Sequence, residues 1–235
     1  MDMPTEPLDV LVVAPHPDDA ELGMAGGILK LKASGQRVGV IDLTDGEPTP
    51  HGTVELRAQE TNRATALLDV DWRGNLGLPN RSLEANLDTR RKLAEVFRRT
   101  KPRWLFAPYW IDAHPDHVAA TELVEAARFW SKLTKSEMAG DPHHPARIFY
   151  YYSVHLKLAI NPGFILDISR QWEKKREILA CYESQFVTGR SQDGRSFLDQ
   201  IEVAAQHWGQ LIGCEYGEPF TSREPLGLNG FSELL

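Results

Sequence analysis

Two short segments of the sequence combine the residue types that bind a divalent metal. The first is His16-Pro17-Asp18-Asp19, and the second, about 100 residues later, is His114-Pro115-Asp116-His117. Imidazole nitrogens and carboxylate oxygens are ligands that Zn²⁺ takes readily, and a catalytic zinc site commonly has three protein ligands and a position for water. The two segments therefore predict one hydrolytic metal centre, provided that the fold brings them together.

Each segment follows an apolar run that is typical of a buried strand. Leu8 to Ala14 (LDVLVVA) precedes the first, and Trp104 to Ala107 (WLFA) precedes the second. In an open parallel sheet, the loops after the strands gather at one edge, where ligands bind. We therefore expect both segments to lie at the same edge of a sheet.

The first two-thirds of the chain alternates between strand-like and helix-like patterns. The expected strands are 8–14, 37–43, 72–76 and 104–107, and the expected helices are 21–33, 54–68, 86–99 and 118–133. After a proline-rich loop, strands are expected at 147–154 and 164–168, and helices at 171–182 and 197–211. This order predicts an α/β fold with a Rossmann-like, mostly parallel sheet and helices on both faces. We expect a single domain over residues 1–235, with residues from about 140 onward forming a cap or extension.

Composition narrows the range of partners. The chain has 26 Lys and Arg against 33 Asp and Glu, a net charge of −7, and no Lys/Arg-rich run. This balance argues against nucleic acid and anionic membranes as partners. The apolar runs are strand-sized and the first residues do not resemble a signal peptide. With Cys181 and Cys214 expected to be reduced thiols, these features predict a cytoplasmic protein.

Each motif has a simpler interpretation when it is taken alone. A lone His-Pro-Asp-Asp is typical of a helix N-cap, where Asp is favoured. Two such motifs, each after a strand, favour the metal site. Asp18 and Asp116 are then candidate bases for a metal-bound water. Gly23, Gly26 and Gly27 do not form a nucleotide-binding G-x-G-x-x-G pattern, so they favour close packing of a helix on the sheet.

The sequence resembles the LmbE-like or PIG-L-type zinc N-deacetylases, which remove acetyl groups from N-acetylglucosaminyl compounds. The resemblance rests on VVAPHPDDAELGMAGG at 12–27 and PYWIDAHPDHVAA at 108–120, with LTDGE at 43–47 and ELRAQE at 55–60 between them. It spans at least residues 8–120. It implies one Zn²⁺ per chain held by His16, Asp19 and His117, although Fe²⁺ would suit similar ligands.

The resemblance also implies roles for the remaining motif residues. Asp18 matches the general base, and His114 matches a protonated histidine that stabilises the oxyanion or protonates the leaving amine. Asp116 is expected to orient that histidine, and Arg57 to contact the sugar. Some relatives carry a tyrosine at the position of Asp112, so the sequence departs from the pattern there. Tyr109 or Tyr152 are the candidates to replace that tyrosine.

Within the family, the chain most resembles the bacterial enzymes of bacillithiol biosynthesis, which deacetylate N-acetylglucosaminyl L-malate. The length and the C-terminal stretch HWGQLIGCEYGEPFTSREPLG at 207–227 carry this likeness. It implies an amino-sugar substrate with carboxylates, for which Arg81 and Arg223 are further candidate contacts. It also implies assembly into a homo-oligomer, a trimer or hexamer.

Several candidate contacts have an alternative structural role. Arg57 could instead pair with Glu60 one helical turn away, and Asp45 could be a turn residue rather than a substrate contact. Tyr152 is a candidate substrate contact whose default role is core packing. His155 either lines the pocket or is a structural histidine.

Alternative functions differ in substrate or in class. The same metal site would serve a deacetylase of N-acetylglucosamine or chitobiose, or an amidase of thiol-sugar conjugates. A non-catalytic carbohydrate-binding relative would be expected to lack Asp18 or His114, and both are present. A metallophosphoesterase usually needs two metals and more ligands than these motifs supply.

Overall fold

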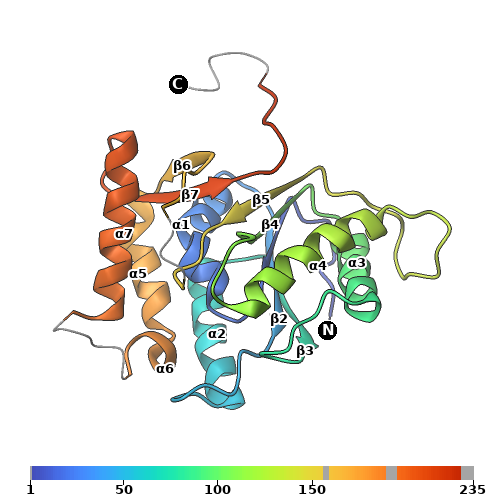
Figure 1. Ribbon diagram of the computed structural model, residues 1–235, viewed down its shortest axis with the longest axis horizontal. Coiled ribbons are helices and arrows are strands. Elements are labelled where there is room, and N and C mark those ends of the chain that lie inside the picture. The colour runs from blue at the N-terminus through green and yellow to red at the C-terminus, as the bar shows by residue number, and fades with distance from the viewer. Residues whose placement is uncertain (1, 156–158, 189–194, 229–235) are drawn as a thin grey trace.

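The computed structural model describes residues 2–155, 159–188 and 195–228. Within these ranges one seven-stranded sheet runs through the molecule in the order β3-β2-β1-β4-β5-β7-β6 (Figure 1). Its strands are β1 (Val10–Ala14), β2 (Val38–Thr44), β3 (Trp72–Leu78), β4 (Trp104–Pro108), β5 (Arg147–Tyr151), β6 (Phe164–Asp167) and β7 (Gly217–Thr221). The first five strands are parallel, and β7 pairs antiparallel with both β5 and β6.

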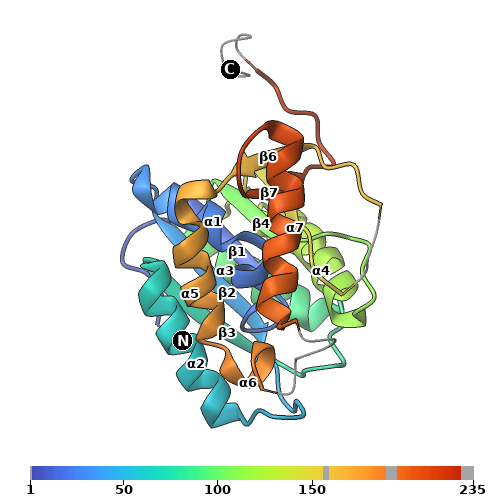
Figure 2. The ribbon, with the colours of Figure 1, turned by 90° about the vertical axis from the view of Figure 1, so that its left-hand side faces the viewer.

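Helices cover both faces of this sheet, as the sequence predicts. They are α1 (Asp19–Ala33), α2 (Val54–Leu68), α3 (Leu87–Thr100), α4 (Pro115–Ser131), α5 (Trp172–Ala180), α6 (Glu183–Phe186) and α7 (Phe197–Ile212), with a short 3₁₀ turn, η1 (Ser169–Gln171). The helices α1, α2, α5 and α7 pack on one face and α3 and α4 on the other (Figure 2). The expectation of an α/β fold is confirmed.

The continuous apolar run of β1 reflects burial on both sides. Val10 and Val12 point into the core beneath α1, whereas Leu11 and Val13 point into the core beneath α3 and α4. All four are fully buried. Because each face of a central parallel strand is covered by helices, the sequence shows no polar alternation there.

The site is positioned by the reversal of strand order next to β1. Val10 pairs with Val38 of β2 on one side and with Trp104 of β4 on the other. The chain thus proceeds from β1 to β3 in one direction and then returns to place β4 against the opposite edge of β1. Ligands bind in open α/β sheets at such a switch point, at the carboxyl ends of the strands. The loops after β1 and β4 both leave from that end.

Two helices start earlier than the sequence pattern indicates. Helix α1 begins at Asp19, and α4 begins at Pro115 rather than near residue 118. In α4, His114 is the N-cap, since its Nδ1 accepts the backbone N–H of Asp116 at 3.2 Å, and Pro115 occupies the first turn. His117 therefore lies within the first turn of the helix, where its direction is fixed.

Strand β7 was not predicted. Gly217, Glu218 and Pro219 have low strand propensity, and the segment reads as a polar tail. The strand nevertheless inserts between β5 and β6, so residues after 140 extend the main sheet. Its Glu218 is buried because it has a buried cationic partner, Lys175, on α5.

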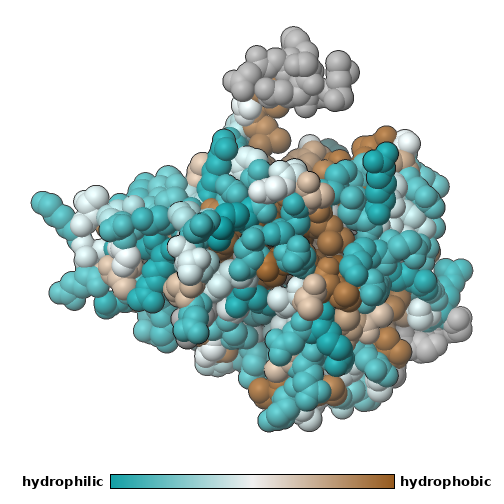
Figure 3. Space-filling model, turned by 180° about the vertical axis from the view of Figure 1, so that it is seen from behind, coloured by the Kyte–Doolittle hydropathy of each residue, from teal (hydrophilic) through white to brown (hydrophobic). Residues whose placement is uncertain are grey.

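The outer surface is largely polar where it is seen from behind. Hydrophilic side chains cover most of that face in Figure 3, and hydrophobic residues form a broken band over its centre. None of the helices in the described ranges combines the length and the hydrophobicity that crossing a bilayer requires. Cys181 and Cys214 are both free thiols.

Candidate metal centre

His16, Asp19 and His117 meet at the carboxyl end of β1 and β4. His16 Nδ1 lies 3.0 Å from Asp19 Oδ2, and His117 Nε2 lies 3.2 Å from the same oxygen. One potential ligand atom from each residue lies within 4.8 Å of the others, and all three side chains are buried. The three residues expected to share an ion thus converge on one point.

The donor atoms fit a divalent cation. His117 Nε2 is buried and, within the described residues, lacks a hydrogen-bond partner, because its approach to Asp19 does not have hydrogen-bond alignment. A buried polar atom without a partner calls for an explanation such as an ion. Two imidazole nitrogens and a carboxylate oxygen form a donor set that Zn²⁺ or Fe²⁺ accepts.

Electrostatics also favour a positive charge at this point. Burial by itself would lower the pKa of His117, but Asp19 and Asp112 outweigh it and raise the pKa to about 10. Burial opposes ionisation of Asp19 as well, yet His117 and His16 hold its pKa well below the usual range. The carboxylates of Asp19 and Asp112 therefore favour positive charge between the two imidazoles.

Each candidate ligand histidine has a carboxylate on its far nitrogen. His117 Nδ1 lies 2.9 Å from Asp112 Oδ2, and His16 Nε2 lies 3.2 Å from Asp116 Oδ2. Metal-binding histidines usually have such a partner, which fixes the tautomer and the ring orientation. Asp112 is a candidate site residue that sequence reasoning missed. It lies five residues before His117, where the pattern suggested only a missing tyrosine.

Asp116 connects the second motif to the first. Its carboxylate faces His16 and accepts the backbone N–H groups of Arg81 at 2.7 Å and Leu83 at 3.1 Å. The contact with His114 runs through the Asp116 backbone, which donates to His114 Nδ1. The described hydrogen bonds of this carboxylate go to His16, Arg81 and Leu83 and not to His114, so its orienting role toward His114 stays a prediction.

His114 lies over the cluster, half-buried. Its ring centroid is 4.8 Å from that of His16 and 4.9 Å from that of His117. Since Nδ1 accepts a hydrogen bond, the remaining proton is on Nε2. Burial, together with His16 and His117, lowers the pKa of His114, which opposes the protonated resting state that the resemblance implies. A second combination, His16, His114 and Asp116, also has ligand spacing, but the oxygens of Asp116 already accept two backbone N–H groups.

Asp18 stands beside the cluster without acting as a helix cap. It occupies the N-cap position of α1 but makes no capping bond, and its Oδ2 lies 2.9 Å from Arg57 Nη1. Its backbone φ of 141° lies in a region that non-glycine residues rarely adopt, a form of strain that is common at functional sites. Burial raises the pKa of Asp18 to about 7, although Arg57 acts to lower it.

Arg57 lies beneath Asp18. The side chain is 3 % exposed, and its guanidinium donates to Pro17 O at 2.6 Å, to Asp18 and, at 3.3 Å, to Glu47 Oε1. Glu60, the alternative partner, accepts instead from the Ser184 backbone N–H and hydroxyl. The geometry therefore makes Arg57 a support for Asp18, although it also borders the cleft. Glu47 was not singled out from the sequence.

A cleft of about 790 Å³ opens over the cluster. Its lining includes His16, Asp18, Asp19, His114, His155 and Arg81. The ring centroid of His155 lies 5.1 Å from that of His117 and 5.5 Å from that of His114, so His155 belongs to the pocket.

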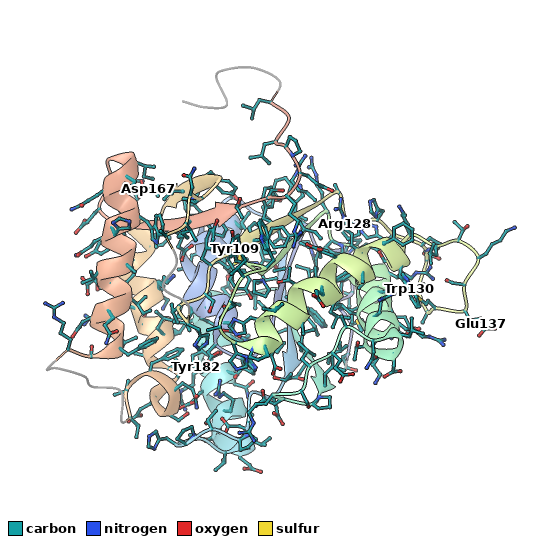
Figure 4. The ribbon with its side chains drawn as sticks, in the orientation of Figure 1. Tyr109, Arg128, Trp130, Glu137, Asp167 and Tyr182 are labelled. Carbon is teal, nitrogen blue, oxygen red and sulfur yellow. The ribbon has the colours of Figure 1, made fainter. Side chains whose placement is uncertain are left out.

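Asp45 and Tyr152 lie elsewhere. Asp45 is exposed, does not line the cleft, and accepts the Glu47 backbone N–H in a turn. Tyr152 and Tyr109 line a smaller adjoining cleft of about 300 Å³, and their rings lie tilted to each other by 38° with centroids 4.5 Å apart. Tyr109 is labelled in Figure 4. Arg223 lies over Trp110, 4.4 Å from its ring centroid, outside both clefts.

Comparison with known proteins identifies the family. Residues 11–128 match the PIG-L family, described as GlcNAc-PI de-N-acetylase. Diacetylchitobiose deacetylase of Thermococcus kodakarensis is 31% identical over 224 residues, which cover 89% of this chain and 80% of the relative. The chain belongs to the PIG-L family. As a member, it is a metal-dependent N-deacetylase by reaction class.

Two further proteins are also similar to this chain. A probable N-acetyl-alpha-D-glucosaminyl L-malate deacetylase 2 of Bacillus anthracis is 27% identical, with 82% of this chain and 88% of the relative covered. The crystal structure of a conserved protein from Thermus thermophilus superposes with a TM-score of 0.86 and 38% identity, over 94% of this chain and 97% of that one.

Proposed function

We propose that the protein uses Zn²⁺, bound by His16, Asp19 and His117, to remove the acetyl group from an N-acetylglucosaminyl conjugate. The observation that carries the proposal is the position of Asp18: a buried carboxylate that adjoins the three-residue cluster at the floor of an open cleft. A base beside a metal cluster is what the hydrolysis of an amide by water requires.

The chain's own residues divide the remaining chemistry. When bound, the metal would polarise the acetyl carbonyl and acidify a water. Asp18 accepts a proton from the attacking water, and Arg57 holds the carboxylate in place through Oδ2. His114 presents Nε2–H to the carbonyl oxygen as negative charge develops there; the loss of one such donor typically costs about 3 kcal/mol in the transition state. The proton taken by Asp18 is then available to the departing amine.

We favour N-acetylglucosaminyl L-malate, in bacillithiol biosynthesis, as the substrate. The C-terminal likeness, the Bacillus anthracis relative and Arg81 at the cleft wall, suited to a carboxylate, support it. Diacetylchitobiose is the second candidate, because the Thermococcus relative is more similar in sequence. N-acetylglucosamine and amides of thiol-sugar conjugates are the remaining candidate substrates. We further propose a single domain that acts in the cytoplasm as a trimer or hexamer.

A substrate panel tests the proposal. Metal-stripped protein is reloaded with Zn²⁺. Free amine is measured with N-acetylglucosaminyl malate, diacetylchitobiose and N-acetylglucosamine, and the released alcohol is measured with a bis-phosphoester. We expect one zinc per chain and the highest kcat/KM for the malate conjugate. Asp18→Asn should retain zinc but lose about 10²-fold or more in kcat. Amine release from none of the sugars, or full activity of Asp18→Asn, would refute the proposed function or its mechanism.

A further inference from the structure

Helix α1 is broken one turn after the metal motif. Met24 has φ −155° and ψ 26°, values outside the helical range, so the segment Asp19–Gly23 is separated from the remainder of the helix. This short segment begins with the candidate ligand Asp19. A single helical turn is not stable alone, so its direction must be set by groups outside α1.

A buried ion pair occupies the break. Lys175 Nζ donates to Leu22 O at 2.8 Å and to Glu218 Oε1 at 2.6 Å. The backbone N–H groups of Gly26 and Gly27 donate to Glu218 at 2.9 and 2.7 Å. In a regular helix, the Leu22 carbonyl would accept the Gly26 N–H directly. Here the Leu22 carbonyl accepts from Lys175 instead, and the Gly26 N–H donates to Glu218.

The glycines allow this close approach. A Cβ on Gly26 would lie 2.6 Å from Ile168 Cγ2 and 3.0 Å from Glu218 Oε1, and one on Gly23 would lie 2.2 Å from the Tyr151 ring. The Gly-rich stretch therefore serves packing at the break, as the sequence predicts. Both charged side chains are buried, Lys175 at 3 % and Glu218 at 2 % exposure.

The two charges come from elements that follow the family motifs. Lys175 lies on α5, which runs beside α1 in Figures 1 and 2, and Glu218 lies on β7 within the C-terminal stretch at 207–227. The pair thus connects two C-terminal elements to the first turn of the metal-binding helix. That gives the C-terminal stretch a physical task that its residue types alone do not reveal.

From this geometry we infer that Lys175 and Glu218 are positioning residues, which set the first turn of α1 and thereby hold Asp19 in place for metal binding. The inference rests on the proposed function only in taking Asp19 as a ligand. Residues that orient metal ligands from outside typically alter affinity about 10- to 100-fold when they are replaced.

Zinc affinity, measured by competition with a chromophoric chelator, tests this inference without a substrate. We expect Glu218→Gln and Lys175→Met to weaken Zn²⁺ binding at least about tenfold. If Glu218→Gln does not fold, Glu218→Asp, which keeps the charge but shortens the side chain, is the second variant. Activity on the best acetylated sugar should fall in parallel at subsaturating zinc.

Arg98→Met is the matched control. Arg98 on α3 is also a buried cation that holds backbone carbonyls, donating to Ser131, Met138 and Gly140. These carbonyls belong to the last residue of α4 and to the loop after it; Trp130 in the last turn of α4 and Glu137 in that loop are labelled in Figure 4. We expect Arg98→Met to lower Tm but to keep the zinc affinity within about twofold of the wild-type value, because the described hydrogen bonds of Arg98 do not reach the candidate metal ligands or their partners.

The outcomes are distinct. Variants of the pair that lose Tm but keep wild-type zinc affinity would overturn the positioning role. Wild-type protein that binds zinc but deacetylates none of the sugars would overturn the proposed function and leave the affinity comparison valid. Wild-type protein that binds no zinc would overturn both.

Discussion

Replacing Arg57 by Met separates its two interpretations, substrate contact and support for Asp18. The change removes a buried cation whose Nη1 lies 2.9 Å from Asp18 Oδ2 and whose Nε lies 3.3 Å from Glu47 Oε1. A charge pair at that distance interacts by about 5 kcal/mol at an effective dielectric constant of 20. Because removing one partner of a buried pair leaves the other uncompensated, we expect the free energy of unfolding to fall by about 3–5 kcal/mol.

The pH dependence gives the decisive readout. Arg57 acts to lower the pKa of Asp18 against burial, so its removal raises that pKa. The base must be ionised, and the acid limb of kcat/KM should therefore move to higher pH by at least about one unit, a tenfold loss of rate below the limb. Zinc content should stay at one per chain.

The assay is the pH–rate profile of deacetylation with the best sugar of the panel, for wild type, Arg57→Met and Arg81→Met. Arg81 lines the same cleft, and its hydrogen bond to Asp116 comes from the backbone N–H, which Arg81→Met retains. Arg81→Met should raise KM for a carboxylate-bearing substrate without moving the acid limb. If Arg57→Met raises KM but leaves the acid limb of the profile unmoved, Arg57 does not support Asp18, and the interpretation of Arg57 as a substrate contact is favoured.

Three further changes probe other parts of the structure. Asp112→Asn should weaken zinc binding about 10- to 100-fold, since Asp112 fixes the His117 ring; unchanged affinity in chelator competition would contradict that role. His155→Ala should lower kcat and change KM less, since the ring borders the cluster on the cleft side. The control is His144→Ala, a histidine remote from the cluster. If His155→Ala has the kcat and KM of the wild type, His155 takes no part in the reaction. Asp71→Asn should cost about 1 kcal/mol at pH 7. Burial opposes ionisation of Asp71, but Lys32 and a backbone N–H lower its pKa, so its contribution is present above the unfolded-state pKa and disappears as pH falls through the folded one. A destabilisation in urea melts that is equal at pH 3 and pH 7 would argue against this linkage.

Local sequence determined the five parallel strands, the helices next to them and the metal motifs, but not strand β7. The strands before each motif are readable because a strand covered on both faces must be apolar along its whole length, as β1 is. The ligand types of His16, Asp19 and His117 are equally local, and a parallel sheet with β1 beside β4 leaves few other places for the two loops to meet.

Only the tertiary structure decided which groups pair with which. Asp116 faces His16, 100 residues away in the sequence, because the loops after β1 and β4 leave the same end of two adjacent strands. The strand around Glu218 was hidden for a related reason. A buried charge is tolerated only opposite its counter-charge, and Lys175 lies 43 residues away along the chain. Sequence patterns report how each residue meets solvent, whereas partners that are distant in sequence are set by how the elements pack.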